Sequence, residues 1–214
     1  MESIITITGQ PTMTDLKEMP TMNFIKIAIL FCFSSLSLSV FSQVKSDSTF
    51  HKVEIGPELQ FYPAGYIIAI SSNIFIKESL AIRLKVGGNF ADREGFSDYN
   101  DEEKAKGFGG GIGLVKYFPY KKGNFIAGIE VDVWNMWTDW KDEVDSSNPQ
   151  SGTTYNLVVQ PWLNAGYLYN VSENLNVGLT LGVGREINVI TNGEAVGEGW
   201  IGLLSFVANF SLKK

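Results

Sequence analysis

In residues 125–133, apolar side chains alternate with small or acidic ones, apart from Ile126, and this is the feature that most limits the fold of this chain. The odd positions are all apolar, whereas Gly128, Glu130 and Asp132 occupy even positions. Successive side chains of a β-strand point to opposite faces, so this segment has one apolar face and one acidic face. Such a strand suits a sheet whose apolar face meets lipid while its acids face an enclosed interior. The fold-level alternative is a soluble ligand-binding barrel, which would keep the apolar face inside.

The same period of two recurs in eight segments, and the chain after the leader has no stretch of convincing helical period. The segments are 50–62, 66–76, 80–90, 106–117, 124–138, 153–169, 175–189 and 200–212. After the first pair, short turns and longer polar loops alternate between them, as they do in membrane barrels. The sequence therefore predicts an all-β fold, an eight-stranded antiparallel up-and-down transmembrane β-barrel.

The N-terminal region predicts export. Residues 22–42 have a basic start, an apolar run and a Ser-rich end, which together are typical of a secretory signal peptide cleaved after Ser42. Residues 1–21 do not resemble a basic leader, so we expect translation to start at Met22 and the barrel domain to occupy 43–214. A permanent helical anchor is the alternative, because the apolar run is about long enough to span a bilayer.

Cys32 is the only cysteine and lies inside the predicted signal peptide. Phe31 precedes it and is not small, so lipid attachment at this position is not expected. The mature chain would then contain no cysteine. This excludes disulfides, thiol catalysis and cysteine-ligated metal, and it remains compatible with export.

Charged residues on the polar face of three segments form the candidate site. They are Glu54, Glu58, Arg83, Lys85, Glu130 and Asp132. An eight-stranded barrel is only wide enough inside for side chains, where isolated charges are costly but opposed, hydrogen-bonded charges are tolerated. We predict an interior charge network that plugs the lumen, with inward glycines making room for the long basic arms. The alternative is that some of these charges line small water pockets.

Aromatic residues gather near the ends of the segments, where membrane barrels carry two aromatic girdles. The set predicted for the periplasmic boundary is Tyr117, Tyr120, Phe125, Tyr167, Tyr169 and Phe210, and the outer set is Tyr66, Phe90, Trp137, Tyr155 and Trp200.

The net charge of -6 is placed unevenly along the chain. Two predicted outer loops contain the acids Asp92, Glu94, Asp98, Asp101, Glu102, Glu103, Asp139, Asp142, Glu143 and Asp145. Neither loop has the ligand spacing of an EF-hand, so solvated loops without bound metal are expected.

Other chemistry is not indicated. His51 is the only histidine and has no serine partner in a position suited to hydrolysis. An acidic chain without a basic stripe argues against nucleic acid as a partner. No catalytic residue and no cofactor are predicted.

With these features the chain resembles the small eight-stranded outer-membrane barrels of Gram-negative bacteria, the OmpA-barrel and OmpX-like group. The resemblance covers residues 50–212 and includes a final segment, 206–212, similar to the signal read by the barrel-assembly machinery. The chain departs from that pattern by ending in Lys213 and Lys214 instead of an aromatic residue.

The resemblance implies an integral outer-membrane protein with periplasmic termini and acidic extracellular loops. Its expected partners are outer-membrane lipid and lipopolysaccharide, the barrel-assembly machinery during biogenesis, and an unidentified extracellular ligand. The expected role is structural or a surface interaction and not enzymatic. A narrow porin-like channel for small solutes is the alternative, followed by a membrane-embedded lipid-modifying enzyme.

Overall fold

The computed structural model describes residues 52–94, 99–143 and 147–212. The predicted upstream extension (1–21), the predicted signal peptide (22–42) and its Cys32 lie outside the described residues. Every regular element of the described ranges is a strand. Among the same residues, no helix is long and apolar enough to cross a membrane.

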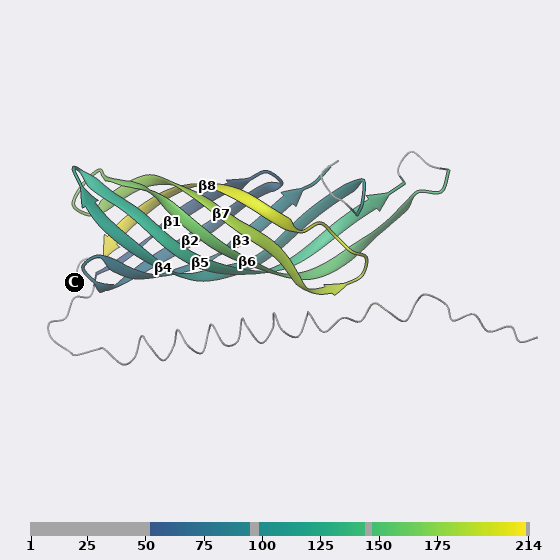
Figure 1. Cartoon of the computed structure of the whole chain (residues 1–214), viewed down its shortest axis with the longest axis horizontal. Coiled ribbons are helices and arrows are strands. Elements are labelled where there is room, and N and C mark those ends of the chain that lie inside the picture. Colours follow the sequence, from purple (N-terminus) through teal and green to yellow (C-terminus); the bar gives the residue numbers. More distant parts are fainter. Residues whose placement is uncertain (1–51, 95–98, 144–146, 213–214) are drawn as a thin grey trace, which may run out of the picture. The chain divides into compact units, whose positions relative to one another are not determined.

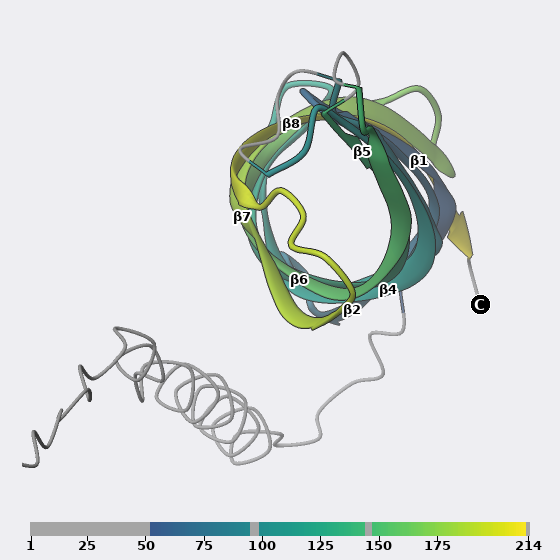
Figure 2. The same cartoon turned by 90° about the vertical axis from the view of Figure 1, so that its right-hand side faces the viewer.

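Eight strands follow one another and close into a ring (Figures 1 and 2). They are β1 (Val53–Tyr62), β2 (Gly65–Lys77), β3 (Leu80–Asp92), β4 (Glu102–Tyr120), β5 (Gly123–Asp142), β6 (Gln150–Asn170), β7 (Leu175–Asn192) and β8 (Gly199–Leu212). Each strand pairs antiparallel with the next, and β8 pairs antiparallel with β1 to complete the barrel. The predicted all-β, eight-stranded up-and-down barrel is confirmed.

The ring has a turn end and a loop end. At the turn end, two to four residues join β2 to β3, β4 to β5 and β6 to β7, and Val53 of β1 pairs with Leu212 of β8. At the loop end lie the connections 93–101, 143–149 and 193–198, together with the short β1–β2 turn. The predicted alternation of connection lengths is therefore present.

Alternation along each strand sends most large apolar side chains outward and most polar ones inward. In β5, Ile129 is 47% exposed and faces out, whereas Glu130 is 6% exposed and faces in. In β4, the outward Phe108 and Ile112 alternate with Gly109, Gly111 and other inward positions. The period of two thus predicted the correct facing for the acidic strand and for the Gly-rich one.

Exposed aromatic rings pack against one another near both ends of the barrel, stacked at the loop end and tilted at the turn end. At the loop end, Tyr66 lies 5.1 Å from Phe90 and Phe108 lies 5.8 Å from Trp137, measured between ring centroids. At the turn end, five of the six rings predicted for that boundary face outward. Tyr117 is the exception, because it is 5% exposed and packs inside the ring.

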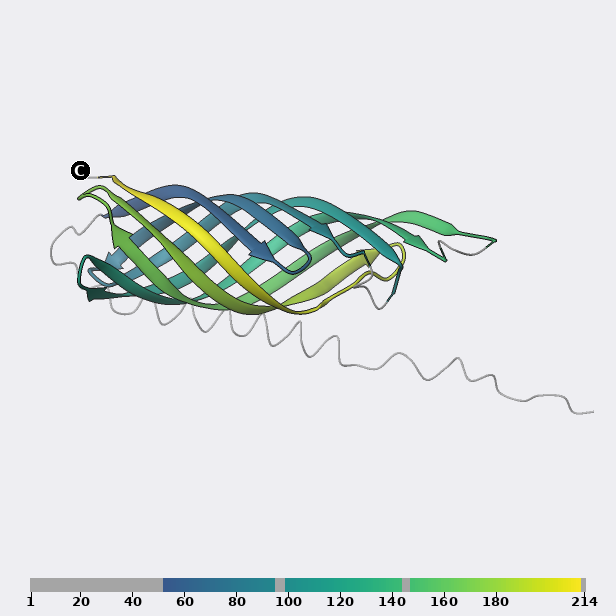
Figure 3. The ribbon, with the colours of Figure 1, turned by 90° about the horizontal axis from the view of Figure 1, so that it is seen from above.

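Strands β4, β5 and β6 are the longest, and Figure 3 shows the β5–β6 hairpin reaching beyond the other strands at the loop end. This corrects the predicted acidic loops, because β4 already begins at Glu102 and β5 continues to Asp142. Glu103 is only 1% exposed, so it is an interior side chain and not a solvated loop residue.

Two apolar clusters lie inside the ring, one in each half. The cluster toward the loop end is formed by Tyr62, Ile67, Ala69, Ala91, Ala105, Trp134, Met136 and Val158. The cluster toward the turn end is formed by Phe75, Ala81, Val115, Tyr117, Ile126, Leu168 and Val207. Buried charged side chains lie between these clusters and at the loop end of the ring, and they form the candidate site.

Candidate functional site

Strand register places opposed charges on two parallel rows across β3, β4 and β5. In the first row Arg83 pairs with Gly113, which pairs with Glu130. In the second row Lys85 pairs with Gly111, which pairs with Asp132. In each row, a glycine of β4 therefore lies between the basic residue of β3 and the acidic residue of β5.

Buried ion pairs form within each row, and one further pair, Lys85 with Glu130, connects the two rows. The distance from Arg83 Nε to Glu130 Oε1 is 2.9 Å, and from Lys85 Nζ to Asp132 Oδ2 it is 2.7 Å. Arg83 Nη2 also donates to Glu58 Oε2, and Lys85 Nζ lies 3.5 Å from Glu130 Oε2. All five side chains are at most 6% exposed, so the group has little contact with solvent. We call these five residues the central network.

The glycines of β4 allow these contacts. A Cβ atom at Gly111 would lie 1.9 Å from Asp132 Oδ1, and one at Gly113 would lie 2.4 Å from Glu130 Cγ. Room was predicted for the basic arms, but the space in these rows is taken by the acids of β5. Acid and base meet across β4 because no side chain stands between them.

Glu54 belongs to the predicted site but lies apart from the other five residues. Its Oε1 is 2.7 Å from Lys52 Nζ and accepts a hydrogen bond from Ser211 Oγ at 3.4 Å. Both partners lie at the turn end, next to the β1–β8 seam. The structure thus brings five of the six predicted residues together and places the sixth in a separate pair.

Neutral side chains that were not predicted complete the central network. Gln60 Nε2 donates to Glu58 Oε1 at 2.7 Å, while Gln60 Oε1 accepts from Lys85 Nζ at 3.3 Å. Trp162 Nε1 donates to Asp132 Oδ2 at 3.1 Å. Hydrogen bonds of this kind offset the cost of removing charges from water. The period of two already placed Gln60 on the inner face, so a signal for it was present in the sequence.

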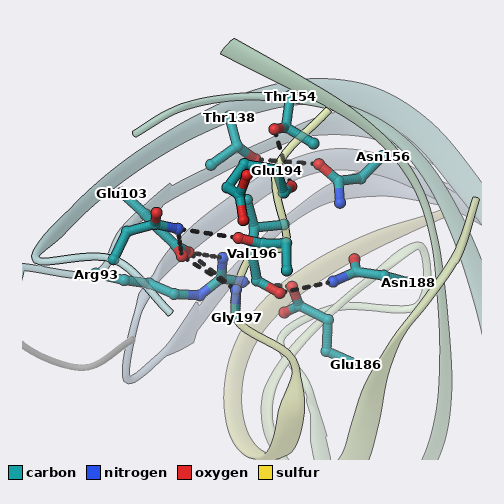
Figure 4. A network of polar contacts seen from close by, with 12 residues as sticks. Arg93, Glu103, Thr138, Thr154, Asn156, Glu186, Asn188, Glu194, Val196 and Gly197 are labelled. Carbon is teal, nitrogen blue, oxygen red and sulfur yellow. Dashed lines mark hydrogen bonds and ion pairs between the residues drawn. The ribbon is translucent and has the colours of Figure 1, made fainter. Parts of the chain in front are cut away.

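A second charged group lies inside the loop end (Figure 4). Arg93 donates to Glu186 and, at 3.3 Å, to Glu103 Oε2, and Glu186 also accepts from Gln160 Nε2 at 3.3 Å. Burial alone would lower the pKa of Arg93, but the Glu186 and Glu103 carboxylates outweigh it and the pKa is raised. Arg93 therefore stays charged. We call Arg93, Glu103 and Glu186 the mouth triad.

The β7–β8 connection, residues 193–198, folds into the opening of the ring beside the mouth triad (Figure 2). We call this segment the strap. Its Val196 is 4% exposed, and Gly197 N donates to Glu103 Oε2 at 3.1 Å. Because the segment has no periodic pattern, the sequence indicates no more than a Gly-rich loop here.

Space beside the central network is small, whereas a cavity of about 160 Å³ at the loop end is lined in part by Arg93, Glu186 and Gly197. A cavity of about 10 Å³ lies beside Glu58, Arg83 and Glu130, which is about the room that one water molecule needs. Among the described residues, no group of three or more His, Cys, Asp or Glu side chains has an arrangement that would hold a metal ion.

Solved structures of two outer-membrane proteins are similar to this chain in fold. Neisserial surface protein A is 12% identical, with a TM-score of 0.52, and the match covers 77% of this chain and 99% of that one. A major outer membrane protein from Thermus thermophilus is 13% identical, with a TM-score of 0.55, and the match covers 77% of this chain and 100% of that one. No family model and no curated protein sequence matches the chain. The fold is therefore that of the small eight-stranded outer-membrane barrels.

Proposed function

We propose that this protein is an integral outer-membrane barrel without enzymatic activity, whose interior is closed by its own side chains. Its role is structural or a surface interaction through the acidic loop end, with both termini in the periplasm. The observation that carries this proposal is the combination of an apolar outer surface with a charge-paired interior. Outer-membrane lipid and lipopolysaccharide are its proposed surroundings, and the barrel-assembly machinery its proposed partner during insertion.

The outer surface supports insertion into a membrane. Large apolar side chains are exposed on every strand, among them Ile70, Val86, Phe108, Leu163 and Leu181. Soluble monomers rarely expose apolar patches larger than a few hundred Å². A surface of this kind is stable in hydrocarbon, and all backbone groups of a closed barrel can pair without water.

A lysine on this surface distinguishes a membrane barrel from a soluble one. Leu181 is 67% exposed in the middle part of β7. We expect Leu181→Lys to lower the free energy of unfolding in lipid vesicles by about 2 kcal/mol, because the charge would enter hydrocarbon. The control is Ser151→Lys, at an exposed position of β6 near the loop end, which should change stability by less than about 0.5 kcal/mol. Equal effects of the two variants would contradict insertion at this depth.

The interior supports a closed barrel. The central network lies between two apolar clusters, and the strap and the mouth triad lie at the loop end. This filling supports the proposal that the barrel has no continuous path for ions, because an eight-stranded interior is only wide enough for side chains.

Single-channel recording in planar bilayers tests closure. Protein whose folding has been verified by heat-modifiable mobility on a detergent gel should give no stable conductance steps. Reproducible steps from the folded species would replace closure with the alternative, a narrow small-solute channel. Absence of a mobility shift on heating would contradict the membrane barrel itself.

A further inference from the structure

The strap is held in the mouth of the barrel mainly through its backbone. In residues 194–197, one backbone group of each residue is hydrogen-bonded to a side chain outside the strap (Figure 4). The contacts are Thr154 Oγ1 to Glu194 O at 3.0 Å, Asn100 Nδ2 to Ala195 O at 3.0 Å, Asn188 Nδ2 to Val196 O at 3.1 Å, and Gly197 N to Glu103 Oε2 at 3.1 Å. Contacts of this type recognise an extended main chain with little regard to its side chains.

One side chain of the strap is also recognised. Val196 is 4% exposed and the adjoining Gly197 is buried, whereas Glu194 and Ala195 are exposed. The mouth thus accepts one small apolar side chain followed by a residue without one. These are the features of a short peptide-binding site, in which the backbone gives affinity and one pocket gives selectivity.

Two of the residues that hold the strap, Glu103 and Asn100, also contact groups outside it. Glu103 accepts from Arg93 at 3.3 Å and from Asn100 Nδ2 at 2.9 Å. Glu186 fixes the other side of Arg93 and is bonded by Gln160. None of these contacts involves the strap, so Glu103 and Arg93 keep them when it leaves, whereas the backbone N–H of Asn188 also donates to Glu198 of the strap itself. A site organised in advance loses less entropy on binding.

We infer that the loop-end mouth of the barrel is a binding site for an extended peptide segment, and that the strap occupies this site in the folded chain. An external peptide with a small apolar residue followed by glycine competes with the strap for the same side chains. The site requires only the folded barrel, in detergent or in lipid, so it does not depend on whether the lumen conducts.

The experiment releases the strap and supplies it again as a separate peptide. Val196→Asp places a carboxylate next to the mouth triad and should expel the strap. The probe is the peptide Glu-Ala-Val-Gly-Glu-amide with a fluorophore on its N-terminal amine; it copies residues 194–198, and binding is followed by anisotropy in detergent. The matched peptide has N-methylglycine at the position of Gly197, so it lacks the N–H that donates a hydrogen bond to Glu103. We expect the released variant to bind the first peptide at least about tenfold more tightly than the second, since hydrogen bonds to charged groups have this magnitude.

Further variants identify the site. In the released background, Glu103→Gln should weaken peptide binding about tenfold. Its neighbour Glu102, which is on the outer face and pairs with Lys141 at 2.7 Å, provides the control: Glu102→Gln should leave binding unchanged. The unmodified protein, with its strap in place, should bind the peptide at least about tenfold less tightly than the released variant.

The outcomes decide the inference. If the released variant shows heat-modifiable folding and binds both peptides equally, or neither, the mouth is not a peptide site. If Val196→Asp does not fold, Gly197→Pro takes its place, because proline removes the same N–H. Stronger binding by the unmodified protein than by the released variant would also overturn the inference.

Discussion

Arg83→Ala should destabilise the barrel by about 3–5 kcal/mol, the usual cost of removing one partner from a buried ion pair. Arg83 is 3% exposed, donates to Glu58 and lies 2.9 Å from Glu130. Alanine would leave both carboxylates without their closest cation in a space that excludes bulk water. The measurement is the free energy of unfolding in urea, followed by tryptophan fluorescence in lipid vesicles.

Lys104→Ala is the matched control for this loss of a cation. Lys104 lies 3.4 Å from Asp92 on the outer surface, where both side chains are more than half exposed. Exposed pairs contribute about 0–1 kcal/mol, so the control should stay near the stability of the unmodified protein. If Arg83→Ala and Glu130→Ala both left stability and bilayer conductance unchanged, the central network would not plug the lumen.

Gly113→Val should cost about 4 kcal/mol because it combines overpacking with a broken ion pair. The first carbon of the new side chain would lie 2.4 Å from Glu130 Cγ and 2.5 Å from Ile129 O. The backbone oxygen has little freedom to move, so Glu130 must swing away from Arg83. Chemical denaturation of the refolded variant, compared with the unmodified protein, measures this loss.

Two other glycines show whether the effect depends on position. At Gly202, which faces outward, an added Cβ atom would have no heavy atom within 4 Å, so Gly202→Val should not destabilise the barrel. At the inward Gly182, the nearest atom would be 3.4 Å away, and Gly182→Ala should change stability by less than about 0.5 kcal/mol. A similar loss at Gly113 and at Gly202 would show that valine harms the strands in general.

Alternation along the chain was enough to predict the barrel and most side-chain facings. The inward positions of Arg83 and Glu130 follow from the period of two alone, because a strand has only two faces. Their contact depends on the β3–β4 and β4–β5 registers. The short β4–β5 turn largely determines the second, whereas β3 and β4 are joined by the long 93–101 connection, so the sequence alone left the first open. The same rule pointed to Tyr117, which has the phase of Gly113. Its aromatic character was mistaken for a girdle signal.

The mouth of the barrel was not predictable in the same way. Glu103 lies in a stretch of acidic and basic residues with no apolar alternation, so its strand could not be detected and its burial was missed. Glu186 continues the inward phase of Gly182 and Gly184, so that signal was available. The strap has no period, and its position depends on contacts with side chains about 90 residues away in the chain, such as Glu103.

The two charge rows also have a consequence for how the barrel is assembled. Sliding β5 by one residue against β4 would turn Glu130 and Asp132 toward the apolar exterior and leave Arg83 and Lys85 without partners. A wrong alignment is therefore penalised on three strands at once, whereas an all-apolar interior would tolerate it more easily. The base and the acid of each row can neutralise each other only when β3, β4 and β5 have joined in the native alignment. The buried charges therefore favour the native alignment of these three strands while the barrel assembles.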